Sequence, residues 1–251
     1  MDLSALLTGQ FLGHALVFAR LGGIIMYMPA LGETVIPVRH RLALAILMTL
    51  AFYPVLPVGP ARLEQPGMLL AAFGIELTLG VWIGLTARIL LTGLEFAGAQ
   101  IGMISGLSNA FAPDMGSFQG STLISTGLML GAVAVIFATD LHHLMISAMV
   151  ESYRIFPQGQ ILAGDLAQQI VTAVGQSFYI GLSVAAPFFV MGVLVNLGMG
   201  LAARMMPTLP VFFVAAPLLI AGGLLMLGVA APMMLREFAE RLADWLRAMV
   251  F

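Results

Sequence analysis

Residues 166–235 form a run of seventy positions with a single charged side chain, Arg204. A water-soluble domain does not bury so long an apolar stretch. Because one helix of ~20 apolar residues crosses the hydrocarbon core of a bilayer, this run predicts at least two membrane passages. The natural place for the chain to reverse between them is residues 204–210.

The composition extends this conclusion to the whole chain. Of its 251 residues, 61% are hydrophobic and only 9% are charged, whereas roughly a quarter of a soluble domain is charged. The chain contains no cysteine and no lysine, which excludes disulfides, thiolate metal sites, Schiff-base chemistry and the lysine of a phosphate-binding loop. We therefore expect an all-α, polytopic integral membrane protein.

Six hydrophobic segments can be delimited, and most contain a residue that interrupts an ordinary membrane helix. They cover residues 9–28, 42–58, 68–92, 120–139, 173–201 and 209–235. Proline kinks a helix, and membrane helices tolerate it when neighbouring protein satisfies the freed carbonyl. Pro54, Pro187 and Pro217 therefore predict kinked helical hairpins that pack against other protein. No positive residue precedes the first segment, so we expect it to be retained as an anchor and not cleaved.

Small residues recur at every fourth position in three places. The three sets are Glu76, Gly80, Gly84 and Arg88, then Gly98, Gly102 and Gly106, and then Gly192, Asn196, Gly200 and Arg204. This spacing places each set on one face of a helix, where the missing side chains let another backbone approach closely. The stripes predict a tightly packed assembly of several helices.

Residues 105–122 are rich in glycine, serine, asparagine and proline, which predicts a loop. Phe111, Met115 and Phe118 make this loop more apolar than an ordinary solvated linker. Two interpretations remain open at this point. The loop is either a plain connector or a mobile apolar segment that seals a passage.

Charged residues inside the apolar segments suggest two alternative roles. Glu76, Arg88 and Glu95 would each cost ~2.5–3.5 kcal/mol at the centre of a bilayer, so they require partners or a water-filled path. Ion pairing between helices is the favoured interpretation. A proton or ion relay, as in a secondary transporter or ion channel, is the alternative.

The chain shows no convincing catalytic or metal-binding motif. His142 and His143 lie between Asp140 and Glu151, but adjacent histidines point about 100° apart on a helix and cannot easily share an ion. We interpret residues 140–156 as an amphipathic helix with a polar face. A membrane enzyme centred on the two histidines has no supporting motif, so we expect no enzyme activity, no metal and no cofactor.

The last sixteen residues, 236–251, hold six of the twenty-two charged side chains. Phe238, Leu242, Trp245 and Met249 would share one helical face. This pattern predicts a separate amphipathic helix that lies against a partner subunit or the membrane interface.

Three segments together match the pattern of one known family. The matching residues form three groups along the chain. They are Arg20, Glu33, Pro37 and Arg39, then Glu95, Gly98 and Gly102, and then Asn196, Gly200, Arg204 and Pro207. The chain resembles the FliR proteins of the bacterial flagellar export apparatus, which have homologues in virulence type III secretion. His142 also falls where that family has a comparable residue. The family usually continues Pro-Gln-Leu-Asn after its arginine, whereas this chain has Pro-Thr-Leu-Pro at 207–210.

The resemblance implies a subunit of an export gate in the flagellar basal body of the bacterial inner membrane. There, FliR forms with FliP and FliQ a channel for unfolded flagellar proteins, with FlhB alongside and FlhA below. Residues 1–165 would resemble FliP, residues 166–235 would form a hairpin resembling FliQ, and residues 236–251 would be the C-terminal helix. We expect FliP, FliQ, FlhB, FlhA, exported flagellar proteins and membrane lipid as partners, and no nucleic acid.

The resemblance also implies roles for individual residues. Loop 105–122 corresponds to the family's plug, which obstructs the channel when no substrate is moving. The implied plug residues are Met103, Gly106, Asn109, Phe111, Pro113, Asp114, Met115, Gly116 and Phe118. The implied assembly residues are Arg20, Glu33, Pro37, Arg39, Glu95, Gly98, Gly102, His142, Asn196, Gly200, Arg204 and Pro207.

Overall fold

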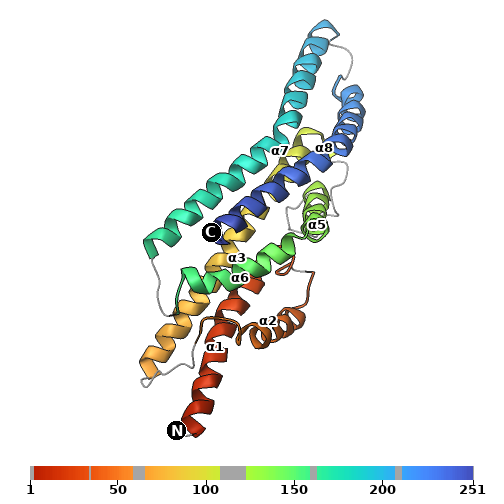
Figure 1. Cartoon of the computed structure of the whole chain (residues 1–251). Coiled ribbons are helices and arrows are strands. Elements are labelled where there is room, and N and C mark those ends of the chain that lie inside the picture. The colour runs from red at the N-terminus through yellow and green to blue at the C-terminus, as the bar shows by residue number, and fades with distance from the viewer. Residues whose placement is uncertain are drawn as a thin grey trace. The chain divides into compact units, whose positions relative to one another are not determined.

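The computed structural model describes residues 3–33, 35–58, 66–107, 123–158, 163–206 and 211–250, and these residues contain seven α-helices and no strand (Figure 1). The helices are α1 (Leu3–Tyr27), α2 (Val38–Phe52), α3 (Pro66–Ile104), α5 (Leu123–Ala138), α6 (Leu141–Ile155), α7 (Ala163–Met205) and α8 (Val211–Val250). The predicted all-α fold is confirmed.

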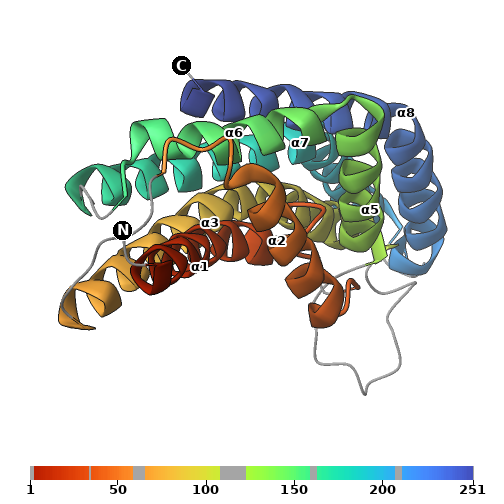
Figure 2. The same ribbon diagram turned by 60° about the horizontal axis from the view of Figure 1, so that its bottom comes forward.

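Fewer helices can cross a membrane than the six hydrophobic segments suggested. Within the described residues, α1, α3, α7 and α8 are long and apolar enough. Helices α5 and α6 meet at 78° across a short break, and they add a fifth passage if the pair is one broken span (Figure 2). Helix α2 has 15 residues, which is short of the ~20 that a passage needs.

The predicted C-terminal helix is not separate, because α8 runs unbroken from Val211 to Val250. The change from apolar to charged sequence at Arg236 marks a change of surroundings for the helix and not its end. Arginine, glutamate, alanine and leucine, which dominate the last turns, are all strong helix formers. Proline does not end these helices either, since Pro187 lies inside α7, and Pro217 and Pro232 lie inside α8.

The chain divides into two compact units, each assembled from segments that are distant in sequence. The first unit comprises Met1–Ile89, Ile136–Ala173 and Leu242–Phe251. The second comprises Leu90–Val135 and Val174–Arg241. Helices α3, α7 and α8 each contribute to both.

In the first unit, α1 and α3 run parallel in close contact (Figure 2). A Cβ atom at Gly23 of α1 would lie 2.8 Å from the backbone nitrogen of Val81. A Cβ atom at Gly80 would meet the carbonyl oxygen of Arg20, and one at Gly84 would lie 2.6 Å from that of Ile24. The predicted packing role of the stripe on α3 is confirmed, because only glycine allows this approach.

In the second unit, α3 is flanked by α7 and α8. A Cβ atom at Gly93 would lie 2.5 Å from the carbonyl oxygen of Ser177, and Thr92 Oγ1 lies 3.4 Å from Ser177 Oγ. The Arg241 guanidinium lies 5.0 Å from the centre of the Tyr179 ring, so the end of α8 within this unit lies beside the start of α7. Within this unit α7 and α8 therefore run antiparallel.

Candidate functional site

Arg20 lies at the centre of a buried ion-pair network in the first unit. Its Nε donates to Glu76 Oε2 at 2.6 Å, and its Nη2 donates to Glu76 Oε1 at 3.0 Å. Both side chains are completely buried. This two-pronged contact is the strongest geometry for an arginine–carboxylate pair, and it joins α1 to the first charged residue of the α3 stripe.

The remaining donors of Arg20 reach α6 and the residue after it. Nη1 donates to the backbone carbonyls of Ser152 and Phe156, both at 2.9 Å. The guanidinium also lies 4.2 Å from the centre of the Tyr153 ring, a distance at which a cation attracts an aromatic face. A buried charge is tolerated when its partners are complete, so this network fastens α1, α3 and α6 together.

A second ion pair closes the other end of the same stripe. Arg88 Nη1 donates to Glu33 Oε1 at 2.8 Å, with side chains 23% and 16% exposed. The charges at the two ends of the α3 stripe thus both have partners. Glu76 pairs with α1, and Arg88 pairs with the segment that follows α1. The prediction of ion pairing between helices is confirmed for Glu76, whereas Arg88 pairs with Glu33 in the segment that follows α1.

Glu95 differs from these two residues. Its side chain is half-buried and has no ion pair with any residue that the structure describes. Its backbone carbonyl accepts a hydrogen bond from Ser125 Oγ at 3.0 Å. One turn on, a Cβ atom at Gly98 would lie 2.5 Å from Ser125 Cα, and Gly102 is buried. Gly98 therefore forms the contact between α3 and α5.

The stripe on α7 is packed at one end and open at the other. A Cβ atom at Gly192 would lie 2.5 Å from Ile104, and Asn196 Nδ2 donates to the Gly192 carbonyl at 2.8 Å. A Cβ atom at Gly200 would meet nothing within 4 Å, and Arg204 is exposed in the last turn. Pro207 lies outside the described residues.

Two predicted assembly residues mark the start of α2. Pro37 occupies the position before the first helical residue, with φ −56° and ψ 141°. This extended conformation is the one that proline favours outside a helix. Arg39 is exposed in the first turn.

The structure describes the beginning of the predicted plug loop. Met103 is 68% exposed near the end of α3. Gly106 has φ +70°, a left-handed conformation that glycine adopts readily and that commonly ends helices. Helix α3 thus ends at Ile104, and the chain turns at residues 105–106. The other predicted plug residues, namely Asn109, Phe111, Pro113, Asp114, Met115, Gly116 and Phe118, lie outside the described residues.

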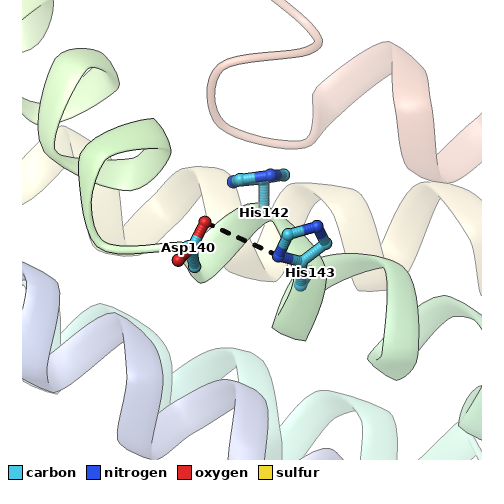
Figure 3. A group of neighbouring side chains, drawn as sticks. All are labelled: Asp140, His142 and His143. Carbon is cyan, nitrogen blue, oxygen red and sulfur yellow. Dashed lines mark ion pairs between the residues drawn. The ribbon is translucent and has the colours of Figure 1, made fainter.

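His142 belongs to a small polar cluster where α6 begins (Figure 3). Asp140 has φ 58°, and its Oδ1 lies 3.7 Å from His143 Nδ1 (Figure 3). The two histidine rings do not diverge as the helical spacing predicted, because their centres are only 4.1 Å apart. One donor atom from each of the three side chains lies within 4.8 Å of the others.

The three side chains could hold a metal ion, but they supply only three ligand atoms, and Asp140 and His143 are exposed. His142 is half-buried and lies 5.4 Å from Phe137 between ring centres. The arrangement therefore fits a polar corner between α5 and α6, with His142 packed against an aromatic neighbour.

Sequence reasoning missed one essential feature of the site, the partner of Arg20. Glu76 is 56 residues away in the chain, and helical periodicity does not say which helices meet. The carbonyls of Ser152 and Phe156 carry no sequence signal at all.

Comparison with known proteins identifies relatives along nearly the whole chain. The family described as bacterial export proteins, family 1, matches residues 11–245. Flagellar biosynthetic protein FliR of Caulobacter vibrioides is 40% identical over 219 residues, which cover 86% of this chain and 87% of the relative. FliR of Escherichia coli is 27% identical over 224 residues, covering 89% and 85%. Yop proteins translocation protein T of Yersinia pestis is also 27% identical over 224 residues, covering 85% and 83%.

Proposed function

The chain belongs to the bacterial export proteins, family 1, and from this membership we propose that it forms, with FliP and FliQ, a protein-conducting channel. It is a membrane-embedded component of a flagellar or type III export apparatus. Its proposed cargo is unfolded flagellar proteins, which cross the bacterial inner membrane at the flagellar basal body. FlhB and FlhA are the further partners that we propose.

The observation that carries this proposal is that the chain by itself buries little of the apolar part of α8. In the most apolar part of Ala215–Ala248 only 11% of residues are buried, compared with 56% in Thr8–Tyr27. Such a surface requires lipid or other subunits. Gly200 of α7 is also open, so close packing of a helix from another subunit is the favoured arrangement.

The same membership suggests how the chain is organised. We propose that residues 1–165 are the FliP-like part and that residues 166–235 are the FliQ-like hairpin. The relatives carry the names of export components, and we propose no catalytic step for this chain. A secondary transporter would act alone, whereas a gate subunit requires its partners.

Co-expression of the chain with FliP and FliQ tests the proposal. We expect one complex that contains all three proteins after affinity purification through this chain. Reconstituted alone, the chain should transport neither ions nor protons. Recovery of the chain without FliP and FliQ, together with ion transport by the chain alone, would favour the transporter.

Arg204 is expected to stabilise this complex and not to act on the cargo. Its exposed charge at the open end of the α7 stripe would become buried against a partner, where loss of one member of an ion pair costs ~3–5 kcal/mol. Arg204→Ala should lower the yield of complex at least tenfold while export per assembled gate is kept. Arg154→Ala is the control, because Arg154 pairs with Glu151 on an exposed surface. Normal yield with abolished export would give Arg204 a role in conduction.

We expect the same outcome for Glu95, whose half-buried carboxylate has no ion pair among the described residues. Glu95→Ala should reduce the amount of complex before it alters export per gate. Quantifying FliP and FliQ bound to each variant, alongside secretion, separates the two effects. An unchanged amount of complex would contradict this role.

The plug loop is expected to control leakage through the channel. Deleting residues 109–118 should leave the complex assembled but let ions and small solutes cross the inner membrane. Exposed Met103 and left-handed Gly106 stand at the start of this loop. Conductance of reconstituted complexes measures the effect, with co-purification of FliP and FliQ as the control for assembly. Equal conductance of deleted and intact complexes would show that the loop is a connector.

A further inference from the structure

An apolar groove of 380 Å³ opens in the first unit between α1, α2 and α3. Its walls include Phe18 and Met26 of α1, Leu42 of α2, and Phe73 and Leu77 of α3. Met26, Leu42 and Leu77 are exposed. The groove therefore presents hydrocarbon to its surroundings over three consecutive helices.

Arg41 is the one formally charged side chain among the described residues that line the groove. Its Nη1 donates a long hydrogen bond, 3.4 Å, to the carbonyl of Gly32. Its Nε is buried and has no hydrogen-bond partner among the described residues. A guanidinium carries five N–H donors, so this side chain has donors left for an anionic acceptor.

Neighbouring charges do not neutralise Arg41. The carboxylate of Glu33, next to Gly32 in the chain, is already bound by Arg88 at 2.8 Å. Arg39 is exposed in the same first turn of α2 and adds positive charge. Arg41 thus supplies one positive charge to a groove whose other lining residues are uncharged.

We propose that this groove binds an anionic phospholipid, with an acyl chain against the apolar walls and the phosphate on Arg41. A membrane-embedded chain is surrounded by lipid, and basic pockets between membrane helices suit anionic headgroups. The volume is at the small end of ligand sites, which span ~300–1,000 Å³. A helix is about 10 Å across and would not enter it. The proposal rests on membrane embedding and groove geometry, and is independent of any channel function.

Two substitutions separate the apolar and the ionic parts of the site. Gly22 lines the groove, and a Cβ atom there would come no closer than 3.9 Å to a neighbour, the ring of Phe18. Gly22→Leu therefore fits and fills the groove. Arg41→Gln keeps a polar side chain but removes the charge. Gly67→Leu, at an open glycine outside the groove, and Arg154→Gln, at an exposed arginine outside the groove, are the matched controls.

Native mass spectrometry of the full chain in detergent, with dioleoyl phosphatidylglycerol and dioleoyl phosphatidylcholine as probes, measures the binding. The wild type should retain one lipid and prefer phosphatidylglycerol by roughly fivefold, the effect expected of one arginine near an anionic headgroup. Arg41→Gln should lose that preference, and Gly22→Leu should lose both lipids. Both controls should behave as wild type.

Other outcomes would overturn the proposal. Equal retention of the two lipids by the wild type excludes the role of Arg41, and lipid retention by Gly22→Leu excludes the groove. Displacement of the lipid by soluble glycerol 3-phosphate at equal concentration would indicate a phosphate site without an acyl subsite. If Gly22→Leu instead blocks FliP and FliQ binding while lipid binding is unchanged, the groove is a protein contact. If Gly22→Leu does not accumulate, Leu42→Asn, at an exposed wall residue, replaces it.

Discussion

Replacing Glu76 by glutamine is expected to lower the free energy of unfolding of the chain by ~3–5 kcal/mol. This is the usual cost of leaving one partner of a buried ion pair unpaired. The substitution keeps the shape of the side chain but removes the charge that Arg20 contacts through two nitrogens. Both groups are out of contact with solvent, so water cannot replace the lost partner. Thermal unfolding of the purified chain in detergent measures the change.

Two further variants make this test specific. Replacing both residues with leucine should recover much of the lost stability, because removing a buried pair together is often neutral. Arg154→Gln breaks an exposed pair with Glu151 and should cost only ~0–1 kcal/mol. An unfolding midpoint of Glu76→Gln equal to that of the wild type would show that the pair contributes nothing to the fold.

Leucine at Gly80 is expected to separate α1 from α3 and to prevent stable folding of the first unit. Even a Cβ atom at this position would meet the carbonyl of Arg20, so the whole α1 backbone must move. Overpacking a tight contact typically costs ~1–3 kcal/mol, and occasionally more. The shift of α1 would also pull Arg20 from Glu76. Accumulation in the membrane and resistance to proteolysis measure the effect.

Gly74→Leu provides the control within the same helix. A Cβ atom at Gly74 would meet nothing within 4 Å, so the added side chain should be tolerated. Because both substitutions replace glycine with leucine in α3, they change intrinsic helix propensity alike. If the two variants accumulate equally, the close approach at Gly80 is not limiting for folding.

The sequence predicted the helical class and the packing faces because both follow from periodicity. The four-residue spacing of Gly80 and Gly84 places them on one face, and that face packs on α1. Periodicity does not reveal which other helix occupies a face. Glu76 could therefore be recognised as costly in lipid, but its partner Arg20 could not be identified.

Helix ends were harder to predict, for a different physical reason. The boundary expected at Arg236 followed a change in polarity, while the backbone responds to propensity and continues to Val250. The corner at Asp140 depends on one left-handed residue. Asparagine, aspartate and glycine tolerate that conformation, but the sequence does not say where it is used.

The parallel arrangement of neighbouring helices limits the order in which they can pack against one another during synthesis. Trp82 of α3 donates to the carbonyl of Leu166 of α7, 84 positions later, in the first unit, and Thr92 and Ser177 meet at a separation of 85 in the second. Helices α1 and α3 are parallel as well, so the chain must return between them. The helix on that return path, α2, has 15 residues and spans about 22 Å, less than the ~30 Å of a hydrocarbon core. A ribosome delivers this short limb before α3, so α2 can pack first on α1, where the His14 and Tyr53 rings stack with centres 3.7 Å apart.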